Sequence, residues 1–347
     1  MEMILNKKIE IFFAIFVLIM IISCDNGTNE NDVPDDHNNN DNHDNDTTEV
    51  IENSGFLFAG RVIGDFVQSH YYDIENDLII PFGNQTSRDM VWNPTRDSVY
   101  FNYGGLGQGI WTLALEMPEM EPMLIYDSPY SEYEIMRTTQ RFVFNAVSGA
   151  ITLMSWDGAN LDTAFYGSSG IVENFRISND STMFAFQYWG LQRKIYIVEI
   201  LDTIPWDTLC TIAGEYYCWL DYDDDKIFVA TAENGYIYSI REDADTVFVP
   251  MPQSGLKDVM NKDFQLFGVF SAGDSTEVWI LEANYYIARK ICSIYGNPIS
   301  ADISPFQEII VVAVDRGSWD YMVKVNIDTG SKTEIAMGNT ISKIRWK

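Results

Sequence analysis

The hydrophobic and polar positions of this chain change pattern twice. Residues 11–22 are all apolar, residues 25–54 hold almost no apolar side chain, and residues 55–347 alternate between apolar runs and polar turns. The runs of the third segment are five to eight residues long, and the turns between them are rich in Asp, Asn, Gly and Ser. Such runs between such turns are typical of β-strands. The pattern therefore predicts a β-rich domain over residues 55–347.

The strongest apolar run recurs at a nearly constant spacing. The intervals between its successive copies are 43, 43, 41, 44, 39 and 43 residues, and the copies begin at Phe56, Val99, Phe142, Met183, Ile227, Leu266 and Ile309. Around the last copy, the pattern predicts four antiparallel strands at 298–304, 309–314, 321–327 and 332–337. Four-stranded units of ~40–45 residues in series are the repeat of a β-propeller.

We therefore predict an all-β fold, a seven-bladed β-propeller of four-stranded antiparallel blades. The first unit begins with its second strand at Phe56, whereas residues 339–347 form an additional strand after the seventh unit. We expect residues 339–347 to be the innermost strand of the first blade, so that the two ends of the domain close the ring. Six or eight blades would follow if one interval were misassigned, and the 39-residue interval before Leu266 is the weakest.

Several turns before the apolar runs share a local motif, at 92–98 (WNPTRDS), 177–182 (ISNDST) and 303–308 (ISPFQE). This motif resembles the WSPDG-like repeats of the TolB-like and WD40-like (PD40-type) bacterial propellers. The resemblance covers the whole domain, and it implies a propeller fold whose faces bind partners.

The amino terminus has the features of a targeting segment. Lys7 and Lys8 precede the twelve apolar residues 11–22, a run long enough for a signal peptide and too short for the ~20 residues that span a bilayer. The residues that follow, Ser23 and Cys24, resemble with their aliphatic neighbours the lipobox of bacterial lipoproteins. The resemblance implies a signal peptide over 1–23 and acylation of Cys24 with palmitate-like chains, which would anchor the protein in a membrane.

Residues 24–54 are expected to form a disordered, acidic tether. Between 25 and 54 there are ten Asp or Glu, nine Asn and no Lys or Arg, so this segment cannot bury enough apolar surface to fold. The tether carries −10 of the net charge of −29, and the propeller carries −19. So acidic a protein repels phosphate backbones, which argues against nucleic-acid binding. We expect a bacterial envelope location, at the outer membrane on its periplasmic or surface side rather than at the inner membrane.

The sequence shows no catalytic constellation. His70 is the only histidine of the propeller, and no nucleophile motif accompanies it. Cys210 and Cys218 are predicted on an outermost and an innermost strand, too far apart for a disulfide, and Cys292 makes the number of remaining thiols odd. We expect all three to be buried thiols, and we expect no catalytic residue, no metal and no cofactor. A catalytic pair of carboxylates stays an alternative, because so acidic a chain contains many carboxyl groups.

A binding face is predicted where the loops between second and third strands meet the loops between blades. The candidate contact residues there are aromatic side chains and one arginine, namely Trp189, Arg316, Trp319, Tyr130, Tyr133, Tyr216, Tyr217 and Tyr295. Aromatic rings beside an arginine suit a protein interface or the stacking of a sugar. For each ring, the alternative is that it fills a gap between blades.

Two functions are consistent with these features. The first is a membrane-anchored envelope lipoprotein whose propeller is a non-enzymatic scaffold for a protein partner. The alternative is a glycan-binding or glycan-degrading propeller lipoprotein. The missing catalytic constellation favours the scaffold.

Overall fold

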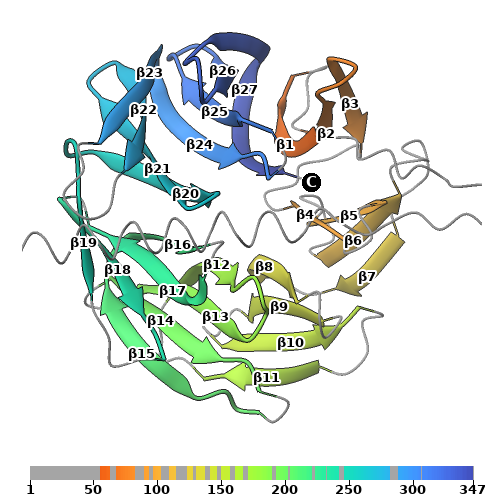
Figure 1. Cartoon of the computed structure of the whole chain (residues 1–347). Helices are drawn as coiled ribbons and strands as arrows, with labels where there is room; N and C mark the ends of the chain where they lie inside the picture. The colour runs from red at the N-terminus through yellow and green to blue at the C-terminus, as the bar shows by residue number, and fades with distance from the viewer. Residues whose placement is uncertain are drawn as a thin grey trace, which may run out of the picture. The chain divides into compact units, whose positions relative to one another are not determined.

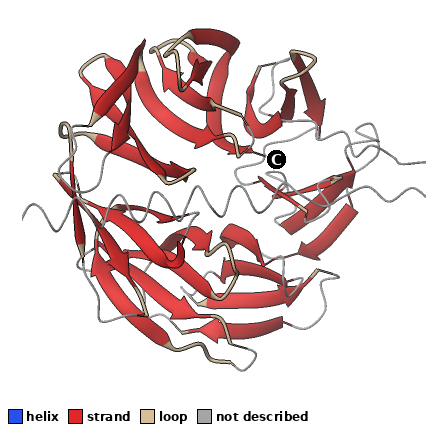
Figure 2. Ribbon diagram, in the orientation of Figure 1, coloured by secondary structure: helices blue, strands red, loops and turns tan. Residues whose placement is uncertain are grey.

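Every regular element in the described part of the chain is a β-strand (Figure 2). The computed structural model describes residues 55–346 except for the segments 63–67, 83–89, 94–96, 103–108, 115–122, 128–129, 137–140, 147–149, 157–160, 167–170, 190–192, 202–203, 221–222, 232, 242–245, 282–287 and 306. The predictions for residues 1–54, including the signal peptide, Cys24 and the tether, lie outside the described residues. No helix of the described residues is long and apolar enough to cross a membrane.

The strands form a ring of small antiparallel sheets around a central axis (Figure 1). Five sheets have four strands each, in the orders β4-β5-β6-β7, β11-β10-β9-β8, β12-β13-β14-β15, β16-β17-β18-β19 and β20-β21-β22-β23. Their innermost strands are β4 (Met90–Trp92), β8 (Tyr130–Met136), β12 (Ile171–Ile177), β16 (Tyr216–Leu220) and β20 (Leu256–Lys262), joined in the ring by β24 (Asn297–Ile303).

The predicted apolar runs are the second strands of the blades. All seven predicted positions are confirmed, in β1 (Gly55–Arg61), β5 (Ser98–Asn102), β9 (Arg141–Ala146), β13 (Met183–Trp189), β17 (Asp223–Ala230), β21 (Gln265–Ala272) and β25 (Ile309–Asp315). These strands are buried on both faces, as in β25, where Ile310 to Val314 have no exposed side chain. A blade packs against a neighbour on each side, which explains why these runs are apolar at consecutive positions.

The outer strands complete each blade. The third strands are β2 (Gln68–Asp73), β6 (Gly109–Ala114), β10 (Ile151–Ser155), β14 (Arg193–Glu199), β18 (Asn234–Ser239), β22 (Ser275–Leu281) and β26 (Asp320–Asn326). The fourth strands are β3 (Leu78–Phe82), β7 (Met123–Asp127), β11 (Leu161–Phe165), β15 (Thr208–Ala213), β19 (Val247–Pro250), β23 (Arg289–Tyr295) and the first half of β27 (Lys332–Trp346).

The two ends of the domain meet in one sheet, as predicted. Its strand order is β24-β25-β26-β27-β1-β2-β3, so two blades share the long strand β27. Lys332 to Gly338 pair with β26, whereas Asn339 to Trp346 pair with β1. The second half of β27 is thus the inner strand of the first blade, and seven blades close the ring.

The core independently supports seven blades. Seven clusters of buried side chains are present among the described residues, and each draws its members from two neighbouring blades. Phe56, Phe58 and Ile341, for example, pack in one cluster with Val311 and Ala313 of the seventh blade. Closing the ring therefore buries the apolar faces of the described strands between neighbouring blades.

The cysteines and His70 have structural environments. Cys210 lies on β15 and Cys218 on β16, as predicted, and neither these two cysteines nor Cys292 is joined in a disulfide. Cys218 and Cys292 are buried, whereas Cys210 is only half-buried. His70 is fully buried, and its ring stacks on Phe58 at 4.9 Å between ring centres. These positions fit packing roles.

Candidate functional site

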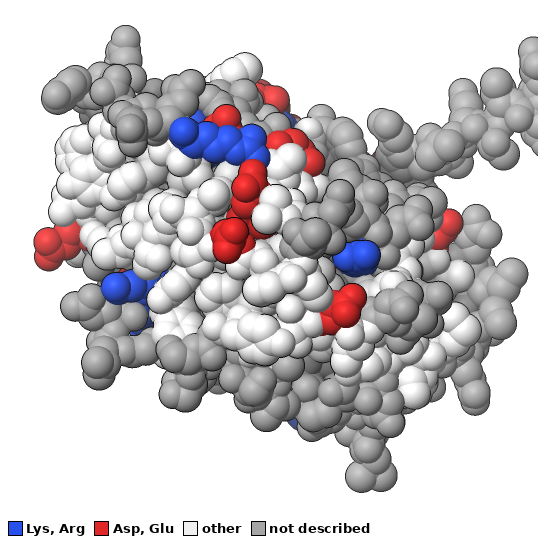
Figure 3. Space-filling model, turned by 90° about the horizontal axis from the view of Figure 1, so that it is seen from below, with Lys and Arg blue, Asp and Glu red and all other residues white. Residues whose placement is uncertain are grey.

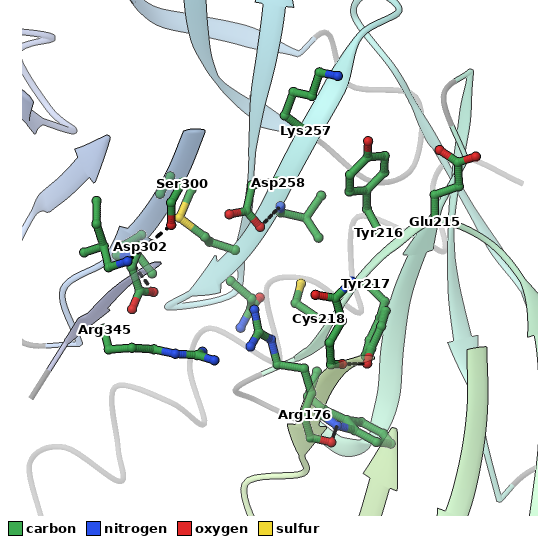
Figure 4. Close-up of a pocket in the computed structure, with 18 of the residues that line it drawn as sticks. Arg176, Glu215, Tyr216, Tyr217, Cys218, Lys257, Asp258, Ser300, Asp302 and Arg345 are labelled. Atoms are coloured by element: carbon green, nitrogen blue, oxygen red, sulfur yellow. Dashed lines mark hydrogen bonds between the residues drawn. The ribbon is translucent and has the colours of Figure 1, made fainter. Parts of the chain in front are cut away.

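A cavity of about 630 Å³ opens at the centre of the ring. Its walls come from the inner strands of four consecutive blades, β12, β16, β20 and β24, and from the second half of β27 (Figure 4). Cavities of this size accommodate small-molecule ligands in proteins. The charged side chains in the wall are three bases, Arg176, Lys257 and Arg345, and three acids, Glu215, Asp258 and Asp302.

The inner strands reach the cavity through β-bulges. The pairing of β12 shifts between Glu173 and Arg176, that of β20 between Leu256 and Asp258, and that of β24 between Pro298 and Ser300. The residues inside these shifts include Asn174, Lys257 and Ile299, all of which line the cavity. A bulge adds one residue to a strand and changes the direction in which the following side chains point. The bulges therefore direct toward the cavity side chains that strict alternation would place on the other face of the strand.

Asp258 and Asp302 are the two carboxylates that face the cavity from adjacent inner strands. The amide of Val259 donates to Asp258 Oδ1 at 2.9 Å, and the amides of Ile303 and Trp346 donate to the two oxygens of Asp302 at 2.9 and 3.0 Å. Burial raises the pKa of Asp258 to about 6 although nearby Arg176 opposes the shift, and the negative charge of Asp302 raises it further. Burial likewise raises the pKa of Asp302, against the opposing effect of Arg345. Asp258 therefore titrates close to neutral pH.

Two guanidinium groups extend into the same space. Figure 4 shows Arg176, from β12, and Arg345, from β27, with their guanidinium groups directed toward the middle of the cavity. The backbone of Arg176 is held by the Trp219 indole, which donates to its carbonyl at 3.1 Å. Its guanidinium donates through Nη1 to the Phe175 carbonyl at 3.3 Å, a long contact. The strands β12 and β27 thus hold the guanidinium groups of both arginines in the cavity.

A neutral polar side chain adds donors and acceptors to this wall. Both amide atoms of Asn261, on β20, are buried and have no hydrogen-bond partner. Asn261 lines the cavity together with Ser300, whose hydroxyl accepts the amide proton of Ile344 at 3.2 Å and keeps its own proton to donate. An unpartnered buried amide is costly, and such groups are normally satisfied by a bound molecule or water.

Of the predicted contact residues, Tyr216 lines the cavity, and Trp189 is linked to the cavity wall through an ion pair. The Arg193 guanidinium carbon is 3.7 Å from the centre of the Trp189 ring, and Arg193 Nη1 lies 3.5 Å from Glu215 Oε1. Glu215 and its neighbour Tyr216 line the cavity. The structure thus connects Trp189 to Tyr216 through the Arg193–Glu215 ion pair.

Three other predicted residues form a second group where the turn between β25 and β26 of blade seven meets the end of β23 in blade six. We call it the blade-seven cluster: Tyr295, Arg316 and Trp319. Arg316 donates through Nε to the Tyr295 carbonyl at 2.9 Å, and its amide donates to the Trp319 carbonyl at 2.9 Å. The side chains of Tyr295 and Trp319 are 65% and 46% exposed. Gly296, at φ 112°, follows Tyr295 and allows the chain to turn into β24 where a Cβ would lie 2.8 Å from the Asp315 carbonyl.

The structure places two predicted residues in the interior instead of on the face. Tyr133 is fully buried, and its hydroxyl donates to the Tyr100 carbonyl of the preceding blade at 2.6 Å. Tyr217 is 6% exposed and donates to the Ala185 carbonyl of the preceding blade at 3.2 Å. Both rings fill gaps between blades. Tyr133 therefore leaves the set of candidate contact residues, whereas Tyr217 also lines the cavity. Tyr130 begins β8, and its side chain lies outside the described residues.

The charged residues of the cavity were not singled out from the sequence. Arg176, Asp258, Asp302 and Arg345 each occur in a short inner strand, as in LKDVMNK around Asp258 and NPISADI around Asp302. A charged residue among the apolar positions of an inner strand is the signal that marks them. Among the described residues, no group of three or more His, Cys, Asp or Glu side chains is arranged to hold a metal ion.

The charges on the outside are mixed in sign. On the side of the molecule shown in Figure 3, described Lys and Arg side chains lie beside Asp and Glu side chains. Elsewhere on the outside, Arg241 forms two ion pairs. Its Nη2 lies 3.7 Å from Glu199 Oε1, and its Nη1 lies 3.3 Å from Asp225 Oδ1. Exposed pairs of this kind contribute little to stability.

Comparison with known proteins identifies the fold. No protein-family model matches the sequence, and no curated protein matches it. A putative 6-phosphogluconolactonase from Bacteroides uniformis has a TM-score of 0.61 at 10% identity, over 85% of this chain and 100% of the other. The periplasmic gluconolactonase of Pseudomonas aeruginosa has a TM-score of 0.55 at 11% identity, over 84% and 98%. TolB from Acinetobacter baumannii has 0.54 at 11% identity, over 84% of this chain and 66% of its own. At these identities the likeness shows a shared fold, and the chain is a β-propeller similar to TolB and to the gluconolactonases.

Proposed function

We propose that this protein is a lipid-anchored protein of the bacterial envelope whose propeller binds a protein partner without catalysing a reaction. The observation that carries the proposal is the exposure of Tyr295 and Trp319 in the blade-seven cluster. Large aromatic side chains with a neighbouring arginine are the residue types that dominate the binding energy of protein interfaces.

The blade-seven cluster is also preorganised. The Arg316 guanidinium carbon lies 4.0 Å from the centre of the Tyr321 ring, and Arg316 Nη2 lies 2.6 Å from Glu334 Oε1. With its hydrogen bond to Tyr295, this arginine has contacts on several sides, so it holds the cluster in one arrangement. A rigid surface loses less conformational entropy when a partner binds.

A cross-linking experiment tests the partner surface. A photoreactive phenylalanine analogue replaces Trp319 in the full-length protein in its native host, and a matched protein carries it at Phe248, an exposed aromatic residue on the outer strand β19. We expect one defined adduct from position 319, and we expect Trp319→Ala and Tyr295→Ala to weaken binding of the purified partner. Equal adducts from both positions, or binding unchanged by both alanine substitutions, would reject the proposal.

The anchor is tested separately, because it concerns Cys24 alone. Cells that incorporate a palmitate analogue should label the wild-type protein, and Cys24→Ala should abolish the label. Cys218→Ala, which removes a buried thiol, serves as the control and should keep it. Label that persists in Cys24→Ala would show that the protein is not a lipoprotein of this type.

A second candidate function is favoured by the cavity. Two of the structural neighbours are described as a putative 6-phosphogluconolactonase and a gluconolactonase. Asp258, with a pKa of about 6, is a carboxyl group able to exchange a proton near neutral pH. This candidate is a protein that binds or hydrolyses a small sugar-derived molecule. Hydrolysis of gluconolactone by the wild type, lost in Asp258→Asn, would favour it; equal rates for both proteins would exclude Asp258 as the catalytic group.

A further inference from the structure

The cavity wall combines hydrogen-bond donors that carry positive charge with acceptors that carry negative charge. The guanidinium groups of Arg176 and Arg345 offer donors suited to an anion, and arginine binds carboxylates through two parallel hydrogen bonds. Asp258 and Asp302 offer acceptors that face the same space from the neighbouring strands β20 and β24. The wall as a whole balances three bases against three acids, in a domain with a charge of −19.

This balance discriminates among small ligands. A simple inorganic anion would use the arginines but would be repelled by the two aspartates. A neutral sugar would bond the aspartates through its hydroxyl groups but would leave the arginines without a new partner. A molecule that carries both a carboxylate and several hydroxyl groups uses both sets of side chains. The unpartnered amide of Asn261 and the hydroxyl of Ser300 provide further hydrogen bonds for such hydroxyl groups.

From this arrangement we infer that the central cavity binds a sugar acid, with its carboxylate between Arg176 and Arg345 and its hydroxyl groups toward Asp258, Asp302 and Asn261. The Tyr216 ring, which lines the cavity, supplies an apolar surface to a sugar ring. The cavity volume of about 630 Å³ accommodates a molecule of one or two sugar units. The inference extends the second candidate function, but it concerns binding only and does not require hydrolysis.

Calorimetric titration of the full-length protein in detergent tests the inference with four probes. They are glucuronate, glucose, glucosamine and inorganic phosphate, so the first two differ only by a carboxylate, the third is cationic and the fourth has no sugar. We expect glucuronate to bind more tightly than glucose by about 10- to 100-fold, the range expected for hydrogen bonds to a charged group. We expect glucosamine and phosphate to bind no more tightly than glucose.

Variants separate the site from the rest of the propeller. Arg176→Gln and Arg345→Gln should each reduce the affinity for glucuronate to that for glucose, with thermal unfolding used to verify that they fold. Arg176→Lys keeps the charge but loses the two-pronged geometry, so it should retain only part of the affinity. Arg241→Gln is the matched control, because Arg241 lies outside the cavity wall and pairs with Glu199 and Asp225, and it should leave the affinity unchanged.

Three results would overturn the inference: glucose binding as tightly as glucuronate, phosphate binding more tightly than glucuronate, or no binding by any probe. Glucuronate binding that survives both glutamine substitutions would place the site elsewhere and would also overturn it. Binding of glucuronate without hydrolysis of gluconolactone would support this inference and exclude the hydrolase function. A failure of the binding inference can therefore be distinguished from a failure of the hydrolase function.

Discussion

Phe56 and Trp346 lie opposite each other in neighbouring strands, with their ring centres 5.3 Å apart. These residues come from the two ends of the described chain, so their contact is part of the closure of the ring. Phe56 is fully buried, and it also contacts Tyr72 at 5.2 Å between ring centres. The stability of the first blade therefore depends on the carboxyl-terminal strand.

Removing the closing strand should destabilise the whole propeller. Trp346→Ala should lower the free energy of unfolding by about 2 kcal/mol, less than for a fully buried tryptophan because this ring is half-buried. Deletion of residues 339–347 should lower the free energy of unfolding further. It also exposes the edge of β1, and an exposed strand edge promotes aggregation. Urea denaturation measures both, with Trp319→Ala as an exposed control expected to change stability by no more than about 0.5 kcal/mol. A truncated protein as stable as the wild type would contradict closure by β27.

The two buried tyrosines should contribute to the stability of the propeller. Tyr133→Phe and Tyr217→Phe each remove a hydroxyl that donates to a carbonyl of the preceding blade, so each should cost about 1 kcal/mol. Neither substitution should change binding of the protein partner, and Tyr133→Phe, which lies outside the cavity wall, should also leave glucuronate binding unchanged. If either variant lost partner binding at unchanged stability, that tyrosine would instead belong to the binding face.

His70 should make the protein sensitive to acid. Burial lowers the pKa of His70 to about 4 from 6.5. At pH values above 6.5 the imidazole is neutral in both the folded and the unfolded chain, so the full stability is present. As the pH falls from 6.5 to 4, the imidazole of His70 is protonated in the unfolded chain but stays neutral in the folded one. About 3 kcal/mol of the free energy of unfolding is lost as a result.

The variant His70→Phe removes this titration while keeping an aromatic ring beside Phe58. Its free energy of unfolding should fall less than that of the wild type between pH 8 and pH 5, as measured by urea denaturation at each pH. Identical losses in both proteins would show that other groups cause the acid sensitivity.

Asp258 should act in the opposite direction. Burial raises the pKa of its carboxyl group from 3.8 to about 6, so the folded protein holds a poorly solvated charge above pH 6. This cost is relieved as the pH falls through 6 toward 3.8. Asp258→Asn should therefore be more stable than the wild type at pH 8, and the advantage should disappear near pH 4.

Asp180 provides a control of opposite sign. Although burial alone would raise the pKa of its carboxyl group, hydrogen bonds from Ser178 and Thr182 lower it overall. Asp180→Asn should thus be less stable than the wild type at pH 8. If both asparagine variants changed stability in the same direction at pH 8, the proposed environment of Asp258 would be wrong.

The propeller itself was readable from the sequence, because it depends on local patterns that repeat. Each second strand is buried by neighbours on both faces, so runs such as Ile309 to Val314 must be apolar throughout, and their spacing gives the number of blades. The missing inner strand before Phe56 and the additional strand after Gly338 likewise determine that the two ends share a blade. These features require only the period of the strands and the rule that each blade needs four.

The cavity and the roles of the aromatic residues were decided by the tertiary structure. Tyr216 and Tyr217 are neighbours in one strand and both line the cavity, yet Tyr216 is half-buried while Tyr217 is buried and donates a hydrogen bond across to the preceding blade. Alternation along a strand tells the two faces apart, but only the packing of the next blade decides what each face meets. Arg176, Asp258, Asp302 and Arg345 come from four strands spread over 170 residues of sequence. Bulges shift their register, and closure of the ring brings them around one cavity, so their proximity is a property of the assembled ring.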